Sequence, residues 1–304
     1  MLPTLRQLQY LALLAEHGSF SRAAEAAHVT QPTLSAGVQE LERILGSPVV
    51  DRARSGMILT PVGEDVVRRA QDVLARAEDL VQAARSAGRP LTGRFRLGVI
   101  PTVAPYLLPR ALPLFRARFP ELRLFLREDQ TARLVAGLKA GVLDAALIAL
   151  PFEMQGIEVA PVMDDELVAA FPANHAATAS ATVTPEALAR EELILLEDGH
   201  CFRDHALLAC GLDAPRAATH PGESQVEGVF AATSLATLVQ MVGSGLGVTL
   251  LPAMAVAAGL ADTAPVMVRP ISGVASYRQV VVAWRTGSSR EAEARLLAGA
   301  IQVA

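Results

Sequence analysis

Residues 19–52 read SFSRAAEAAHVTQPTLSAGVQELERILGSPVVDR. Apolar side chains at positions 20, 23, 24 and 27 follow helical spacing and predict a short helix. After a break at residues 28–30, apolar side chains at positions 34, 38, 41 and 45 predict a second helix, with Thr30 as its N-cap and Pro32 in its first turn. Two short helices joined by a tight turn form a helix-turn-helix motif.

The second predicted helix carries polar side chains on the side away from its apolar face. A helix in the major groove reads bases with its N-terminal residues, and glutamine can bond an adenine edge. The run after it predicts a β-wing with two arginines placed for phosphate or minor-groove contact. The predicted contacts to double-stranded promoter DNA are Thr30, Gln31, Pro32, Thr33, Ser35, Gln39, Arg52 and Arg54. The alternative is an ordinary helical hairpin that does not bind DNA. Residues 1–60 hold as many acids as arginines, so this segment has no net positive charge that would favour DNA binding.

The quoted stretch resembles the winged helix-turn-helix of LysR-type transcriptional regulators. The residues that carry the resemblance are Ala23-Ala24, Val29-Thr30-Gln31-Pro32 and Leu34-Ser35, followed by Leu-Glu-x-x-Leu-Gly at 41–46. The resemblance implies that residues 1–60 form a DNA-binding domain. It also implies a regulator that works with RNA polymerase rather than an enzyme.

Residues 61–88 predict one long helix, which begins with Pro61 in its first turn. Apolar side chains recur at spacings of four and three, at positions 62, 66, 70, 73, 77, 80 and 84. Such a stripe favours pairing with a second helix, although it could instead pack on its own domain. In the LysR family this helix is the dimerisation linker, so the resemblance implies a homodimer or homotetramer.

Residues 89–304 alternate apolar runs with helical patterns, which predicts an α/β fold with parallel sheets. The predicted strands are 95–100, 122–127, 143–149, 166–171, 193–196, 247–251 and 278–284. The predicted helices are 104–118, 130–140, 203–210, 234–243 and 288–301. The resemblance implies a regulatory domain like a periplasmic binding protein, with subdomain I at about 94–165 and 268–304 and subdomain II at about 166–267. A small organic effector in the cleft between them is the alternative mode of regulation.

Composition limits the other possibilities. Hydrophobic residues make up 51% of the 304 residues and the net charge is −4, so the chain has material for a core and is not polycationic overall. No run of about 18 apolar residues is present, which argues against a membrane partner. We expect a cytoplasmic protein, because the first residues lack the features of a secretory leader.

The glycines at 243–247 superficially suggest a phosphate-binding loop, but the Lys-Ser/Thr pair of such a loop does not follow them. We therefore expect no cofactor.

Residues 195–211, LLEDGHCFRDHALLACG, hold both cysteines. The pattern predicts a helix with Cys201 at its N-terminus and Cys210 at its C-terminus. The helix dipole, His200 and Arg203 would stabilise a Cys201 thiolate, whereas Cys210 would remain a thiol. Nine helical residues separate the two Cα atoms by roughly 13–14 Å. A disulfide needs them within about 7 Å, so it would require this helix to unfold.

Two other interpretations of this segment stay open at this point. Free cysteines are usually buried and inert. Alternatively, Cys201 and His205 share a helical face, with His200 and Asp204 nearby, and such a set suggests a metal site. The metal interpretation lacks clear further ligands, and Arg203 would repel a cation.

The segment also resembles the peroxide-sensing OxyR branch of the LysR family, through Leu-Glu-Asp-Gly-His-Cys-x-Arg-Asp and a second Cys nine residues later. Further matches lie at residues 100–109, 130–131, 232–235 and 247–252. The resemblance implies that Cys201 reacts with hydrogen peroxide and that Cys210 resolves the sulfenic acid to a disulfide, which a cellular thiol reductant resets. It implies that the residues that bind or polarise the peroxide are Thr102, Thr131, His200, Arg203 and Asp204. The chain would then activate oxidative-stress genes.

The chain departs from the OxyR branch after the second cysteine. The connection at 211–228 is longer than usual, and Val229 stands where the branch commonly has histidine.

Overall fold

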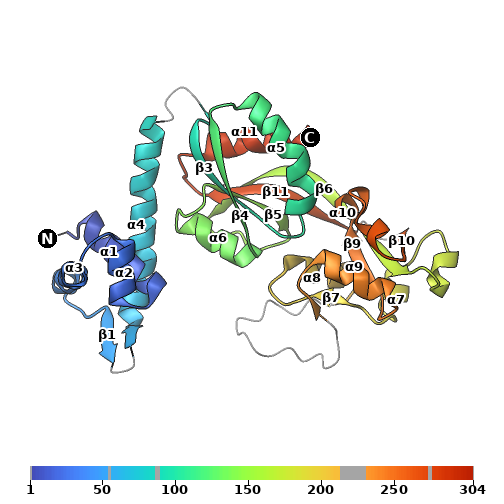
Figure 1. Cartoon of the computed structure of the whole chain (residues 1–304), viewed down its shortest axis with the longest axis horizontal. Coiled ribbons are helices and arrows are strands. Elements are labelled where there is room, and N and C mark those ends of the chain that lie inside the picture. Colours follow the sequence, from blue (N-terminus) through green and yellow to red (C-terminus); the bar gives the residue numbers. More distant parts are fainter. Residues whose placement is uncertain (1, 54–55, 86–89, 213–230, 273–275, 304) are drawn as a thin grey trace.

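The computed structural model describes residues 2–53, 56–85, 90–212, 231–272 and 276–303 (Figure 1). Residues 213–228 of the connection after Cys210, together with Val229 and Arg54, therefore lie outside the described residues. Figure 1 shows a small helical domain at the N-terminus, a long helix beside it and a larger α/β domain. None of the described helices combines the length and hydrophobicity that a membrane span requires.

The N-terminal domain is a winged helix-turn-helix, as predicted. Its elements are α1 (Leu5–His17), α2 (Phe20–Ala26), α3 (Gln31–Leu45), β1 (Val50–Ala53) and β2 (Gly56–Leu59). Thr30 caps α3 by accepting the backbone N–H of Thr33, and Gly46 ends the helix in a left-handed conformation. The core of the domain forms where Leu11 and Leu14 of α1 meet the apolar face of α3. Sequence analysis did not predict α1.

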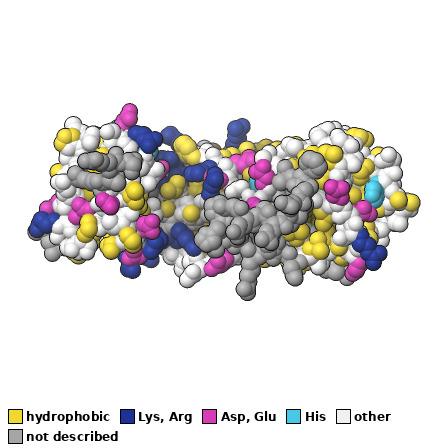
Figure 2. All heavy atoms as spheres, turned by 90° about the horizontal axis from the view of Figure 1, so that it is seen from below, with side chains coloured by type: hydrophobic (Ala, Val, Ile, Leu, Met, Phe, Trp, Pro, Cys, Tyr) yellow, Lys and Arg dark blue, Asp and Glu magenta, His cyan; other side chains and the backbone are white. Residues whose placement is uncertain are grey.

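The long helix α4 (Pro61–Arg85) packs on the N-terminal domain with only part of its apolar stripe. Ala70 is buried in that domain's core, whereas Val62, Val73 and Leu80 are 47%, 45% and 72% exposed. Part of the stripe thus packs on its own domain, and the pairing of its exposed residues with a second helix stays a prediction. Figure 2 shows basic side chains gathered over the part of the molecule that holds α4.

A mixed sheet forms the first half of the α/β domain. The elements there are β3 (Gly93–Val99), α5 (Ala104–Arg118), β4 (Leu122–Glu128), α6 (Thr131–Lys139), β5 (Ala145–Leu150), β6 (Ile157–Pro172), β11 (Tyr277–Arg285) and α11 (Glu291–Gln302). Two strands from later in the chain, β9 (Thr249–Pro252) and β10 (Val266–Pro270), join this sheet. The strand order is β10-β6-β11-β5-β3-β4, with β9 also paired to β6. Figure 1 shows α5 and α11 on one side of the sheet and α6 on the other.

The prediction of parallel sheets is wrong for most strand pairings described in this sheet, because β6 pairs antiparallel with β9, β10 and β11, and β11 with β5. β3 runs parallel to β4 and β5, where strands and helices alternate in the sequence. β11 pairs antiparallel with both β5 and β6, because the chain returns from its C-terminal part and inserts between them. An apolar run shows that a strand exists but does not show which way its partner runs.

The second half of the α/β domain surrounds a separate core. Its elements are α7 (Pro185–Leu188), β7 (Leu195–Leu196), α8 (Cys201–Ala209), β8 (Ala231–Ala232), α9 (Leu235–Gly243), β9 (Thr249–Pro252), α10 (Ala253–Ala257) and β10 (Val266–Pro270). We call the part around the first core subdomain I and the part around the second core subdomain II. The long strand β6 belongs to both, since Ile157 and Val162 pack in the first core and Leu167 and Phe171 in the second.

Two glycines provide a test of the packing in subdomain I. A Cβ on Gly98 of β3 would lie 2.6 Å from Leu134 Cδ2 and 2.8 Å from Leu143 Cδ1. We expect Gly98→Ala to lower the free energy of unfolding by about 1–3 kcal/mol through overpacking. Gly299 of α11 has open space around it, so Gly299→Ala should raise that free energy by up to about 1 kcal/mol through helix propensity. Urea unfolding would measure both, and equal effects of the two substitutions would contradict the packing described.

Candidate functional site

A small pocket lies where three segments of the chain meet. The turn after β3 supplies one wall, the start of α6 a second and the start of α8 the third. Its volume is about 10 Å³, which suits one water-sized molecule. The lining residues are Ile100, Pro101, Thr102, Gln130, Thr131, His200, Cys201 and Phe202. The structure thus brings together four of the predicted site residues, Thr102, Thr131, His200 and Cys201.

Gly199 allows the pocket wall to close. Its φ of +93° lies in the region that favours glycine, and it precedes the N-cap His200 of α8. A Cβ at this position would lie 2.8 Å from the side-chain oxygen of Gln130. The absence of a side chain at Gly199 therefore lets Gln130 line the pocket.

Cys201 is a buried thiol, and the prediction of a stabilised thiolate is wrong for the structure described. Burial raises the pKa of the Cys201 thiol above its ordinary value, and this effect exceeds the lowering by the neighbouring Thr131 hydroxyl and the positive charge of Arg278. Burial also lowers the pKa of the His200 imidazole, which favours its neutral form. Position at a helix N-terminus does not compensate for removal from water.

Arg203 and Asp204 lie outside the pocket lining. The guanidinium of Arg203 points back along the chain, with Nε 3.0 Å from Asp198 Oδ1 and Nη1 donating to the Leu196 carbonyl at 3.2 Å. Asp204 is half-buried, and burial raises the pKa of its carboxyl. The prediction that these two residues contact the occupant of the pocket finds no support in this geometry.

Arg278 is a component of the site that sequence analysis missed. It lies in β11 and is fully buried, and its Nε donates to Asp165 Oδ2 at 2.9 Å. Its Nη1 donates to Thr102 Oγ1 at 2.7 Å and its Nη2 to the Thr102 carbonyl at 3.0 Å. The guanidinium also lies over the Phe202 ring, 5.1 Å from the centroid. The one available signal was a charged residue at the start of a predicted strand, 278–284, whose last five residues are apolar.

The two pocket hydroxyls have different hydrogen-bonding states. Thr102 Oγ1 accepts from Arg278, so its own O–H remains able to donate. Thr131 Oγ1 is buried beside the Cys201 thiol and makes no other hydrogen bond among the described residues. The hydroxyl therefore keeps capacity for a further hydrogen bond, which a small polar molecule in the pocket would use.

His205 does not extend the pocket into a metal site. Its Nε2 lies 3.4 Å from the Pro151 carbonyl oxygen, and burial lowers its pKa to about 4. Among the described residues, no group of three or more His, Cys, Asp or Glu side chains is arranged to hold a metal ion.

Cys210 lies at the other end of α8, as predicted. The helix spans Cys201–Ala209 with Cys210 as its C-cap, two residues earlier at its start than the predicted 203–210. Cys201 packs in the core of subdomain I and Cys210 in that of subdomain II. The two cysteines are free and are not at disulfide distance. That α8 must unfold before they can bond stays a prediction.

Among the predicted DNA-contacting residues that the structure describes, those from Thr30 to Ser35 lie at the start of α3 and Gln39 lies in the middle of this helix. Thr30, Gln31, Pro32, Thr33 and Gln39 are exposed, and Ser35 is half-buried. The Ser21 hydroxyl donates to Gln31 Oε1 at 3.0 Å, so α2 orients the side chain of Gln31. Arg52 lies in β1.

Comparison with known proteins gives consistent matches over both domains. A family model for the bacterial regulatory helix-turn-helix protein, lysR family, matches residues 5–64, and the LysR substrate binding domain matches residues 88–303. The probable hydrogen peroxide-inducible genes activator of Streptomyces viridosporus is 40% identical over 302 residues, which cover 99% of this chain and 94% of the relative. The HTH-type transcriptional regulator EstR of Acinetobacter baylyi is 43% identical over 255 residues, which cover 84% and 81%. The solved structure of a full-length OxyR variant from Pseudomonas aeruginosa is 37% identical with a TM-score of 0.77, and covers 99% of this chain and 98% of that one.

The environment of Cys210 yields a test by pH. Burial raises the pKa of the Cys210 thiol to about 11. In a Cys201→Ser variant, we expect the rate of Cys210 alkylation by iodoacetamide to rise about tenfold per pH unit until the pH nears this value, because the thiolate is the nucleophile. The same variant in denaturant is the control, and its rate should level off above about pH 9. A folded-state rate that also levels off near pH 9 would contradict the assignment.

Proposed function

The chain belongs to the LysR family of bacterial transcriptional regulators, and within this family we propose that it senses hydrogen peroxide through Cys201. It is a DNA-binding regulator rather than an enzyme, and its helix-turn-helix domain binds DNA. The observation that carries the proposal is a buried cysteine in a water-sized pocket beside two available hydroxyls and a buried guanidinium. Relatives named for induction by hydrogen peroxide support it. A small organic effector would not fit this pocket of about 10 Å³, and the alternative that such an effector binds in the cleft between the subdomains stays a prediction.

The proposed first step is the oxidation of Cys201 to a sulfenic acid. The sulfur attacks one peroxide oxygen, so that an S–O bond forms and the O–O bond breaks. The departing oxygen leaves as water after taking up the thiol proton. Thr102 donates a hydrogen bond to the peroxide, and Thr131 provides the second contact. The charge of Arg278, held behind Thr102, stabilises the negative charge that develops on the sulfur and the departing oxygen.

The proposed second step joins the two ends of α8. The Cys210 sulfur displaces the hydroxyl of the sulfenic acid, which gives a disulfide and a second molecule of water. Because the cysteines lie at opposite ends of α8 and in different cores, this step requires the helix to unfold and both cores to repack. Such a change alters how the subdomains pack and thereby the arrangement of DNA-binding domains. A cellular thiol reductant would return the two thiols.

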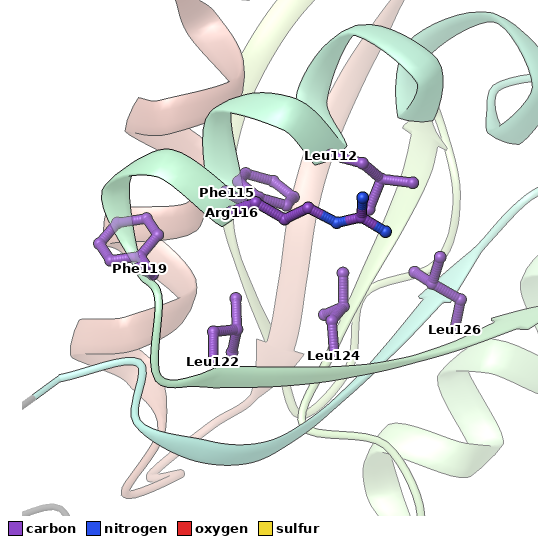
Figure 3. Close-up of a pocket in the computed structure, with 7 residues that line it drawn as sticks. All are labelled: Leu112, Phe115, Arg116, Phe119, Leu122, Leu124 and Leu126. Atoms are coloured by element: carbon purple, nitrogen blue, oxygen red, sulfur yellow. The ribbon is translucent and has the colours of Figure 1, made fainter.

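We also propose that the chain works as a homodimer or homotetramer on promoter DNA. A groove of about 320 Å³ runs between α5 and the sheet-edge strand β4 (Figure 3). Its lining residues are Leu112, Phe115, Arg116, Phe119, Leu122, Leu124 and Leu126. Leu126 and the adjacent Phe125 are 45% and 50% exposed. An exposed apolar groove beside a free strand edge suits a second copy of the chain.

The peroxide proposal predicts different products in two cysteine variants. After brief treatment with peroxide, the chain without substitutions should form a disulfide between Cys201 and Cys210 and so lose the mass of two hydrogen atoms. Cys210→Ser should instead retain a sulfenic acid on Cys201 that dimedone traps, because no resolving thiol is present. Cys201→Ser should give neither product. Mass spectrometry of the peptides distinguishes the three cases, and an unchanged Cys201 in the Cys210→Ser variant would refute the proposal.

The assembly proposal predicts that a charge in the groove separates the subunits. We expect Leu126→Asp to raise the dissociation constant of self-association by about 30-fold or more, as loss of a central interface contact does. Val303→Asp is the matched control, since Val303 is 75% exposed and lies outside the groove. Sedimentation velocity over a range of concentrations measures both. Equal effects of the two substitutions would remove the groove as the interface.

A further inference from the structure

We propose that protonation of His205 opens α8, which means that it releases this helix from the two cores, so that the helix between the cysteines responds to acid as well as to oxidation. His205 lies in the second turn of α8 and is only 4% exposed. One ring nitrogen contacts a carbonyl oxygen, and the other is buried without a partner among the described residues. The inference concerns the opening itself and rests on the proposed function only for its consequence, because the proposed disulfide requires that opening.

The helix α8 depends on its tertiary contacts. It has nine residues, and a helix of this length is marginal in water on its own. One of its faces is buried at the spacing i, i+3, i+4 and i+7, and consists of Phe202, His205, Ala206 and Ala209. The three apolar members of this face pack in the core of subdomain II. His205 is its polar member, so the state of this one ring affects how the whole helix is held.

The surroundings of His205 accept a neutral ring and not a charged one. Nε2 lies 3.4 Å from the Pro151 carbonyl oxygen, and we assign the ring proton to Nε2 from this contact. Nδ1 then carries only a lone pair. Protonation would give Nδ1 an N–H with no acceptor among the described residues. A buried donor without an acceptor is unfavourable, and a buried charge without a partner is more so.

Arg278 of β11 is the charged group that acts on His205. Burial and, to a smaller extent, the positive charge of Arg278 lower the pKa of His205 to about 4, although the contact with the Pro151 carbonyl opposes them. The acid beside Arg278 is Asp165 of β6, which already pairs with the guanidinium and accepts the backbone N–H of Met254. A positive ring at His205 would therefore meet a like charge.

The other titratable groups near His205 do not offset this. Asp204 directly precedes His205, and adjacent residues of a helix do not face each other. Cys201 lies one turn earlier, and burial favours its neutral thiol by raising its pKa. In the loop that carries the Pro151 carbonyl, Glu153 is exposed. The closed helix thus favours neutral His205.

Opening of α8 changes the proton affinity of His205. In contact with water the imidazole has its ordinary pKa of about 6.5, whereas in the closed helix the pKa is about 4. The neutral ring therefore stabilises the closed helix fully above about pH 6.5, and this contribution is lost as the pH falls from about 6.5 to 4. Mild acid thus populates the open conformation, in which Cys210 is able to approach Cys201.

Hydrogen exchange followed by mass spectrometry tests this coupling in the full chain, kept reduced. The protection factor of the α8 amides reports opening of the helix, because it is corrected for the intrinsic pH dependence of exchange. We expect this factor to fall about tenfold between pH 7.5 and pH 5.5, as the difference between the two pKa values requires. The internal reference is α9, which contains no titratable side chain and should keep its protection.

Two substitutions remove the titration at position 205. His205→Gln introduces an amide that can still donate to the Pro151 carbonyl, and His205→Phe keeps a ring. In both variants we expect most of the tenfold fall in α8 protection to disappear. The matched controls replace other histidines. His175→Gln, outside α8, should keep the whole fall, and His200→Gln, at the N-cap of α8, should keep most of it.

Circular dichroism identifies variants that do not fold, and if one substitution at position 205 prevents folding, the other decides the case. Equal protection of α8 at the two pH values would overturn the proposal. An undiminished fall in a folded position-205 variant would also overturn it, as would an equal fall in α8 and α9. Because no peroxide is used, failure of the peroxide proposal would not change any of these results.

Discussion

The pocket depends on one buried ion pair, between Arg278 of β11 and Asp165 of β6. Both side chains are removed from water, so each charge requires the other and a full set of hydrogen bonds. Arg278 completes its set with the hydroxyl and carbonyl of Thr102, while Asp165 Oδ1 accepts the backbone N–H of Met254 in α10. The pair therefore fixes one wall of the pocket and also joins β6, where it passes between the two cores, to α10. Loss of either partner would leave a buried charge unpaired.

Local pattern was sufficient to predict the helices of the DNA-binding domain and the helix between the cysteines. The resemblance to the OxyR branch, rather than the local pattern, named Thr102 and Thr131, which the fold brings to one pocket with His200 and Cys201. The local pattern did not identify Arg278, because the contacts of this residue come from strands and loops far away in the sequence. It gave the wrong direction for the Cys201 pKa for a related reason. Helix position and neighbouring charges are local features, whereas burial depends on the whole fold.

The same limit explains the error about the sheet and the unforeseen direction of the Arg203 side chain. A strand's apolar pattern contains no information on the direction of its neighbours, so the insertion of β11 between β5 and β6 was not predictable. Sequence neighbours of a cysteine need not point toward it, and Arg203 instead pairs with Asp198 on the preceding turn. The apolar stripe on α4 was predictable, but the exposure of only some of its residues was not.

The size of the pocket has a consequence for selectivity among oxidants. A cavity of about 10 Å³ beside a buried sulfur admits molecules of only a few atoms. An alkyl hydroperoxide carries the same O–O bond, but its hydrocarbon portion has no room unless Gln130 or α8 moves. For a cysteine that reacts as proposed here, the pocket walls thus favour the smallest peroxide. Larger peroxides would be excluded by their size before their intrinsic reactivity toward the Cys201 sulfur could matter.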